Sequence, residues 1–252
     1  MGILLPSYAP EPAMTPALAL ISVQGLNTYY GASHVLRGID FHIGQFETIG
    51  LMGRNGMGKS TLLKSIMGLV KPRSGSVNIQ GKNMTGASAF EVAQLGVAYV
   101  PEGRGIFGNL SVKENLVMAA RAGRNGQTNW TYDRVLDTFP RPKERLNHGG
   151  QQLSGGEQQM LTIGRALMTN PDVLILDEAT EGLAPLIAKE IWRICETIKL
   201  TGISSVIVDK NYQHVTKITD RNVILVKGEV VFAGSSAELL AQPALLEQHL
   251  GV

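Results

Sequence analysis

The nine residues GRNGMGKST, at positions 53–61, have the types and spacing of a phosphate-binding loop. They fit the pattern G-x-x-x-x-G-K-[ST] between a strand-like run and a helical pattern, which is the context that this motif requires. Glycines let backbone N–H groups point at phosphate oxygens, Lys59 supplies a full positive charge, and Ser60 offers a hydroxyl to Mg²⁺. A glycine-rich turn with a chance lysine is the poorer interpretation. The residues predicted to bind a nucleotide are Gly53, Arg54, Asn55, Gly56, Met57, Gly58, Lys59, Ser60 and Thr61.

Two acids, Asp177 and Glu178, end the apolar run 173–176. Ligands of open α/β folds bind at the carboxyl ends of the strands, so we expect both acids beside the phosphate loop. Asp177 is predicted to hold Mg²⁺, mostly through water, and Glu178 to orient or deprotonate the water that attacks the γ-phosphate. Without the phosphate loop, solvated acids at a strand end would be the better interpretation.

A second anion-binding motif, LSGGEQQ at 153–159, precedes a helical pattern. Ser154 is placed as a helix N-cap, and Gly155 and Gly156 leave backbone N–H groups exposed. One ATP does not need two such anion-binding motifs from the same chain. We therefore expect Ser154, Gly155 and Gly156 to face the γ-phosphate held by another copy, so that hydrolysis needs a dimer.

The motifs GRNGMGKST, LSGGEQQ and LILDEAT resemble, in this order and spacing, those of the ATP-binding-cassette ATPases. The resemblance covers residues 20–252 and implies an α/β P-loop NTPase fold. Its parts would be a mainly parallel core sheet, an N-terminal antiparallel β subdomain and a helical subdomain inserted at about 87–169. It also implies ATP and Mg²⁺ as ligands and a peripheral place on the cytoplasmic face of the membrane. The implied partners are an identical or paralogous second ATPase subunit, two transmembrane permease subunits and, indirectly, a solute-binding protein.

Further positions follow from the resemblance. Tyr30 matches the aromatic residue that stacks on adenine, although a lone tyrosine there is more often ordinary strand packing, and residues 181–184 match the D-loop of the dimer interface. Glu102 stands where most members have the Q-loop glutamine; its carboxylate can ligate Mg²⁺ but brings negative charge toward the γ-phosphate. Lys210 occupies the switch-histidine position. Lysine can donate to a phosphate, but it cannot shuttle protons near neutral pH unless its pKa is lowered.

The runs PEGRGIF at 101–107 and LSVKENL at 110–116 resemble the importers of branched-chain amino acids, a group that also imports urea, amides and other small organic solutes. Apolar Ile106 and Phe107 lie in a predicted loop, where exposure needs a reason. We therefore expect the segment 103–116 to dock a cytoplasmic helix of the membrane subunit. The alternative is that both side chains pack into the helical subdomain.

Two other functions stay open beside the transport ATPase. One is a soluble ATPase of the same fold that works in DNA repair or translation, although such relatives usually carry long insertions or two cassettes. The other is a weakly hydrolysing regulatory subunit, which the departures at Glu102 and Lys210 motivate.

The elements that must position these residues are short. Apolar β-branched runs alternate with helical patterns, which favours a largely parallel sheet covered by helices. A helix is predicted at 60–67 and mostly helical structure at 87–169. Strands are predicted at 20–43 with a turn at Tyr30 and Gly31, and at 47–52, 75–80, 97–100, 173–176, 205–208, 222–226 and 230–232.

Composition sets the remaining limits. The 252 residues carry 23 basic and 21 acidic side chains, a net charge of +2 that gives no argument for nucleic acid as a partner. The single cysteine, Cys195, is expected to pack in the core and argues against a disulfide framework. No apolar run approaches the ~20 residues of a membrane-spanning helix. Residues 1–19, with four prolines and no basic start, are expected to be a flexible extension and a poor signal peptide.

Overall fold

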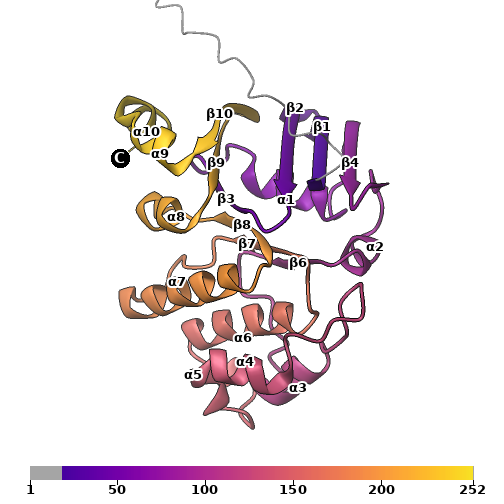
Figure 1. Ribbon diagram of the computed structural model, residues 1–252, viewed down its shortest axis with the longest axis vertical. Coiled ribbons are helices and arrows are strands. Elements are labelled where there is room, and N and C mark those ends of the chain that lie inside the picture. Colours follow the sequence, from indigo (N-terminus) through magenta and orange to yellow (C-terminus); the bar gives the residue numbers. More distant parts are fainter. Residues whose placement is uncertain (1–18, 252) are drawn as a thin grey trace, which may run out of the picture.

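The computed structural model describes residues 19–251, whose strands form two sheets (Figure 1). The first is antiparallel, with strand order β2-β1-β4-β5, and the second has the order β10-β9-β3-β8-β7-β6. The first sheet contains β1 (Ala19–Tyr30), β2 (Ser33–Gly44), β4 (Ser74–Ile79) and β5 (Lys82–Asn83). The second contains β3 (Thr48–Met52), β6 (Val97–Val100), β7 (Val173–Asp177), β8 (Ser204–Val208), β9 (Arg221–Val226) and β10 (Glu229–Ser235).

The predicted fold class is confirmed. In the second sheet the pairings are parallel except that of β10 with β9, and the first sheet supplies the expected antiparallel β layer. Each predicted strand is present with ends within two residues of those expected, except that β10 continues to Ser235, three residues beyond its expected end. Of the expected extension, residues 1–18 lie outside the described residues, and β1 begins at Ala19.

Burial explains the parallel pairing in the middle of the second sheet. Every residue of β3, β7 and β8 is buried, because helices or the other sheet cover both faces. The sequences TIGLM, VLILD and SSVIV are nearly continuous apolar runs, as such strands require. Since β8 pairs with both β3 and β7 in parallel, the segments that follow β3 and β7 emerge at the same edge of the sheet.

The helices lie mostly around the second sheet, and α3 to α6 gather at the end of the molecule farthest from β1 and β2 (Figure 1). Helix α6 contacts α3, α5 and α7 as well as β6. Within the mostly helical range 87–169, β6 is the strand predicted at 97–100, and it belongs to the core sheet. The helices are α1 (Lys59–Ile66), α2 (Ala89–Gln94), α3 (Val112–Val117), α4 (Tyr132–Thr138), α5 (Pro140–Lys143), α6 (Gly155–Leu167), α7 (Pro185–Leu200), α8 (Tyr212–Ile218), α9 (Ser236–Leu240) and α10 (Pro243–Leu250).

Two apolar clusters fill the interior. One packs the antiparallel sheet and α1 against the core sheet, and the other packs the opposite face of that sheet against α6 and α7. Cys195 is buried in the second cluster, which confirms the expected packing role. Burial raises the pKa of its thiol to about 12, so the thiolate does not form near neutral pH.

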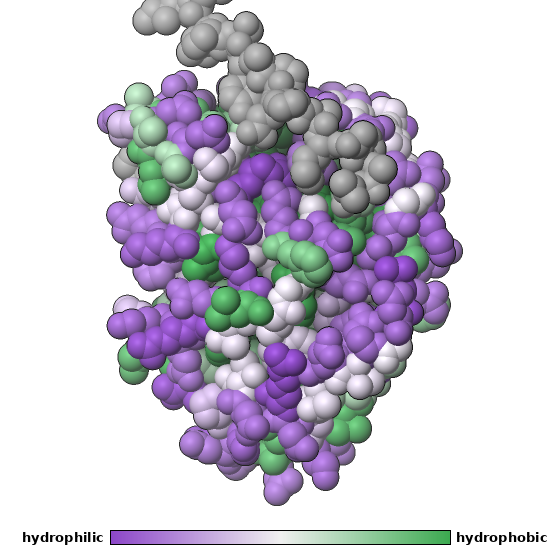
Figure 2. Space-filling model, in the orientation of Figure 1, coloured by the Kyte–Doolittle hydropathy of each residue, from purple (hydrophilic) through white to green (hydrophobic). Residues whose placement is uncertain are grey.

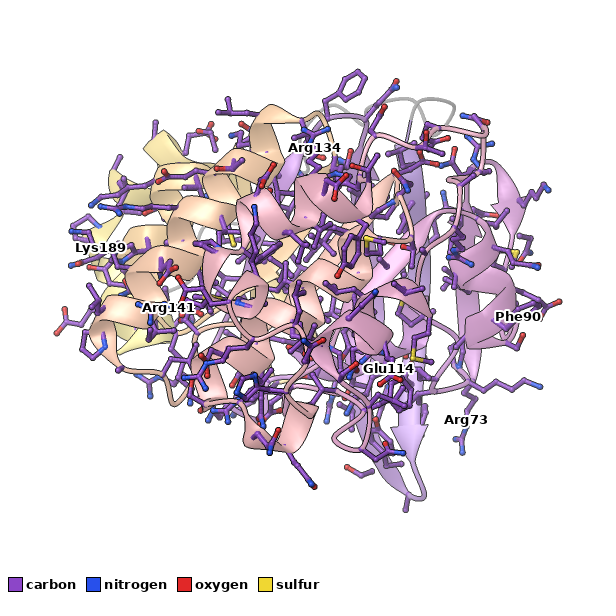
Figure 3. The ribbon with its side chains drawn as sticks, turned by 90° about the horizontal axis from the view of Figure 1, so that it is seen from below. Arg73, Phe90, Glu114, Arg134, Arg141 and Lys189 are labelled. Atoms are coloured by element: carbon purple, nitrogen blue, oxygen red, sulfur yellow. The ribbon has the colours of Figure 1, made fainter. Side chains whose placement is uncertain are left out.

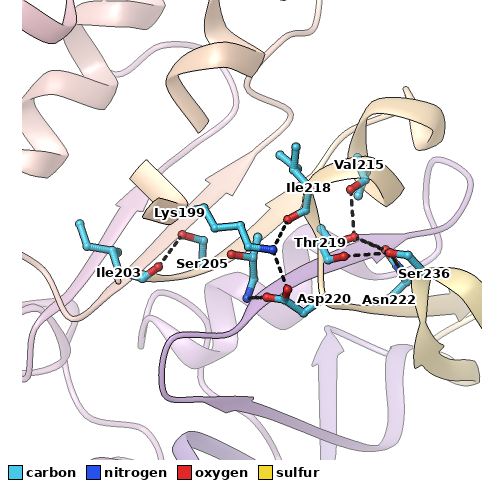
Figure 4. A network of polar contacts seen from close by, with 10 residues as sticks. Lys199, Ile203, Ser205, Val215, Ile218, Thr219, Asp220, Asn222 and Ser236 are labelled. Carbon is cyan, nitrogen blue, oxygen red and sulfur yellow. Dashed lines mark hydrogen bonds and ion pairs between the residues drawn. The ribbon is translucent and has the colours of Figure 1, made fainter. Parts of the chain in front are cut away.

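A polar network fixes the end of the core sheet where β3 begins (Figure 4). Lys199 Nζ, on α7, donates to Ile218 O (2.9 Å) and to Asp220 Oδ1 (2.6 Å), and Thr48 N donates to Asp220 Oδ2 (2.8 Å). The network therefore connects α7, the end of α8 and β3 at the strand end opposite to the motifs.

None of the helices within residues 19–251 is long and apolar enough to cross a bilayer. The face in Figure 2 is largely hydrophilic with scattered hydrophobic side chains. Lys189, on α7, lies at one edge of the molecule in Figure 3, and Arg141, on α5, pairs with Glu190 of α7 (2.8 Å).

Candidate functional site

The loop after β3 has the backbone of a phosphate cradle. Gly58, the N-cap of α1, has φ 106°, and Gly53 has φ 138°. A Cβ added to Gly53 would lie 2.3 Å from Leu225 O, so only glycine fits between the loop and β9. Gly228 N, in the β9–β10 turn, donates to Met57 O (3.0 Å). The loop is thus held between α1 and this turn.

Lys59 is a buried cation with only carbonyl partners. Its side chain is 7% exposed, and Nζ donates to Gly53 O (2.8 Å) and Arg54 O (3.2 Å). Burial lowers the pKa of the Lys59 ammonium, and the smaller attraction of the nearby Glu178 and Asp177 carboxylates raises it. None of the ion pairs within residues 19–251 involves Lys59. An anion at the loop would give this ammonium the charge partner that it lacks.

Asp177 ends β7, is 1% exposed and uses both carboxylate oxygens. Ser60 Oγ donates to Oδ1 (3.3 Å), and Tyr99 OH donates to Oδ2 (2.9 Å). Burial, reinforced by Asp177, raises the pKa of the Tyr99 phenol well above its usual value, so Tyr99 stays a donor. The oxygens of Ser60 and Asp177 are the hard ligands that Mg²⁺ prefers, so this pair fits the expected metal.

Glu178 has an unusual backbone conformation, with φ 53°. Non-glycine residues rarely adopt a positive φ, and such residues are often found at functional sites. Glu178 N donates to Val208 O (2.9 Å), which fixes the turn after β7 against β8. A hydrogen bond with Glu181, followed by burial, raises the pKa of the Glu178 carboxyl to about 7. A proton acceptor with a pKa near the working pH suits general-base chemistry.

These elements enclose a cavity of about 380 Å³. It brings together the phosphate loop, the acid after β7 and the tyrosine that ends β1. Tyr30, at its rim, is 48% exposed. The lining residues are Tyr30, Val35, Asn55, Gly56, Gly58, Lys59, Ser60, Thr61, Glu102, Glu178 and Glu181. A larger cavity, about 430 Å³, lies near Asp172 and Ser204 at the opposite strand ends, and none of the motif residues lines it.

Some of the expected residues are not brought to this cavity. Gly53, Arg54 and Met57 do not line it. The Met57 thioether accepts a bond from Lys227 N (3.2 Å), and the Arg54 guanidinium lies beside Gly251, where an added Cβ would be 3.1 Å from Nη2. Lys210 lies at the outer edge, where its ammonium pairs with Glu181.

The second anion motif lies outside the cavity as well. Ser154 caps α6: its hydroxyl accepts from Glu157 N (3.4 Å), while Ser154 N donates to Glu157 Oε2 (2.7 Å). None of Ser154, Gly155 and Gly156 lines the cavity. A Cβ added to Gly155 would lie 2.6 Å from the Arg104 guanidinium. The expectation that this motif serves the nucleotide of another copy stays a prediction.

Three side chains near these motifs were not singled out from the sequence. Tyr99 binds Asp177 because β6 pairs with β7, a neighbour relation that the chain order does not give. Arg104 reaches Gly155 across about fifty residues of sequence. Glu181 was noted only as part of the run 181–184, and its charge beside Glu178 was the available signal.

Comparison with known proteins places this geometry in a family. The ABC transporter family model matches residues 36–181. The chain is 38% identical to the high-affinity branched-chain amino acid transport ATP-binding protein BraG of Pseudomonas aeruginosa, over 92% of this chain and all of that one. The chain belongs to the ABC transporter family. A probable branched-chain amino acid transport ATP-binding protein, LivF of Archaeoglobus fulgidus, is 36% identical over 90% of this chain and 97% of its own.

A solved structure of an ATP-binding subunit of an ABC transporter matches the fold of this ABC chain with a TM-score of 0.77. The two are 29% identical, over 90% of this chain and 94% of the other. The ABC chain is thus an ATPase that binds nucleotide, and its phosphate loop lies within the matched range.

Proposed function

We propose that the chain is the ATP-binding and hydrolysing subunit that energises an importer of branched-chain amino acids or a related small organic solute. The transport roles in the names of BraG and LivF support this solute class. One observation carries the mechanism: the cavity holds the phosphate loop and Glu178, while the second anion cradle at Ser154 lies outside it. Two copies facing each other would complete two sites.

In this proposal the motif residues in and beside the cavity have separate roles. The loop N–H groups and Lys59 bind the β- and γ-phosphates, and Tyr30 packs on the adenine. Ser60 and Asp177, with Glu102 nearby, hold Mg²⁺, which offsets phosphate charge when bound. Glu178 orients the attacking water and accepts its proton.

The dimer can be tested with Gly155→Asp in a Glu178→Gln background, in which we expect hydrolysis of bound ATP to be slowed strongly. We expect ATP to convert Glu178→Gln from monomer to dimer in size-exclusion chromatography with light scattering, and Gly155→Asp to abolish that shift. The added carboxylate repels a γ-phosphate but suits the first turn of α6 and the adjacent Arg104, so the fold should survive.

The matched control is Asn125→Asp, which adds the same charge in an exposed loop and should leave the dimer intact. ATP binding by the monomer should be equal in both variants. An undiminished dimer in Gly155→Asp would contradict the proposed arrangement of the two copies.

Because the chain belongs to a transporter family, we propose that it binds two transmembrane permease subunits and does not bind nucleic acid. A solute-binding protein on the other side of the membrane would be an indirect partner. A cavity of about 340 Å³ between α2 and α6 is the proposed docking place; Ala93, Leu69 and Arg165 are among its lining residues. Ile106 packs against the core, whereas Phe107 is 42% exposed with the Arg165 guanidinium 4.6 Å from its ring. Of the two expected apolar residues, only Phe107 is free to contact a partner.

Phe107→Glu is therefore expected to lower co-purification of the membrane subunits at least about tenfold, because an exposed aromatic anchor is lost and a charge takes its place. ATP binding and the unfolding temperature should stay unchanged. Leu200→Glu is the control, since Leu200 is 88% exposed on α7 and lies outside the segment 103–116. A lowered unfolding temperature with an intact complex would show that Phe107 serves packing instead.

Transport itself is tested with the purified complex in vesicles. We expect ATP inside the vesicles to be required for uptake of labelled leucine, and competition by isoleucine and valine to exceed that by urea. Uptake that ignores ATP, or uptake of urea alone, would contradict the proposed solute class.

A further inference from the structure

The outer end of the nucleotide cavity carries an exposed ion pair between Lys210 and Glu181. The Lys210 side chain is 54% exposed and that of Glu181 38%. Their contact raises the pKa of the ammonium and lowers that of the Glu181 carboxyl, whose hydrogen bond with Glu178 lowers it most. Lys210 is thus paired with a residue that lines the cavity.

This ion pair is the outermost of three links between the segments that follow β7 and β8. Nearest the strands, Glu178 N donates to Val208 O (2.9 Å). Next, Thr180 donates to the Asp209 carboxylate through its backbone N and its hydroxyl. The inner two links hold both segments in place, so the Lys210–Glu181 pair can open without loss of the turn.

Negative charge is concentrated where this pair lies. Glu102, Glu178 and Glu181 each offer one carboxylate oxygen, and these atoms lie within 4.8 Å of one another. Lys59 and Lys210 are the cations that act on Glu178 and Glu181. A terminal phosphate that enters between Lys59 and Glu178 is repelled by Glu181 and attracted by Lys210. A nucleoside diphosphate lacks the terminal phosphate, so both the repulsion by Glu181 and the attraction by Lys210 act on it less strongly.

We propose that Glu181 holds the Lys210 ammonium in the nucleotide-free chain and that the γ-phosphate of ATP takes it over, so that Glu181 sets how strongly the cavity prefers a triphosphate. The inference rests on the proposed function, because it needs a nucleotide in this cavity. Lysine suits the exchange, since its ammonium sits on a flexible four-carbon stem and can change partners without backbone movement. Glu181 acts as a positioning residue, through Lys210.

The exchange is tested by equilibrium binding of two Mg²⁺-loaded probes to the full chain, the non-hydrolysable triphosphate AMPPNP and ADP. Glu181→Gln keeps the shape of the side chain, removes its charge and frees Lys210. We expect it to tighten AMPPNP binding about tenfold, whereas Lys210→Met should weaken it about tenfold, the size of one charge-assisted hydrogen bond. ADP binding should change less than about twofold in both variants.

A second exposed ion pair provides the control. Lys143 and Asp137 lie 2.7 Å apart with side chains 52% and 71% exposed, and neither lines the cavity. Lys143→Met should leave both affinities unchanged. Equal changes for AMPPNP and ADP, or weaker AMPPNP binding by Glu181→Gln, would show that the pair only supports the turn and would overturn the inference. A wild-type chain that binds neither probe would instead refute the nucleotide site itself.

Discussion

Glu178→Gln is expected to lower ATP turnover by about 10²- to 10⁴-fold, the usual range for loss of a general base. The variant keeps the shape of the side chain and its hydrogen bond to Glu181, but the amide cannot accept the proton of the attacking water. ATP affinity should stay within about threefold of wild type, because Lys59, Ser60 and the loop N–H groups remain. The measurement is phosphate release by the complex, together with the nucleotide retained after gel filtration.

Glu196→Gln serves as a control, since Glu196 is an exposed acid on α7 outside the cavity. If Glu178→Gln and wild type hydrolyse ATP at the same near-zero rate in the assembled complex, the chain is a regulatory nucleotide-binding subunit. A clear loss of turnover with ATP retained by the variant excludes that alternative. The departures at Glu102 and Lys210 make this comparison decisive for the present chain.

Lys59→Ala is expected to weaken Mg²⁺-ATP binding by at least about 10²-fold, because it removes a cation that donates to phosphate oxygens. ADP binding should weaken less, since ADP lacks the γ-phosphate. The thermal midpoint without nucleotide should not fall, because burial already disfavours the charged Lys59 side chain. Binding is measured by calorimetry.

Lys64→Ala is the matched control on the same helix, and Lys64 does not line the cavity. It should leave the ATP affinity unchanged. If both variants bind ATP like wild type, the loop after β3 is not the phosphate site, and the proposed roles of Ser60 and Asp177 fail with it.

The sequence alone determined which residues form the phosphate loop and which acids follow the buried strand β7. These motifs are local: a loop between a strand and a helix needs glycines, Lys59 and Ser60 at fixed spacings, whatever surrounds them. The strands were equally readable, because each buried strand is a short apolar run whose ends are set by polar or glycine residues. The resemblance added the adenine position of Tyr30 and the separate role of Ser154 to Gly156, which remain predictions.

The tertiary structure decided the contacts between residues distant in the chain. Tyr99 binds Asp177 through the β6–β7 pairing, and Arg104 lies against Gly155. Ile106 is half-buried against the core whereas its neighbour Phe107 is exposed, a division that no local pattern gives. Lys210 and Glu181, 29 positions apart, meet because parallel β7 and β8 release their following segments at one edge of the sheet. Sequence spacing fixes which groups are present, whereas strand order and packing fix which charges face each other at the proposed ATP site.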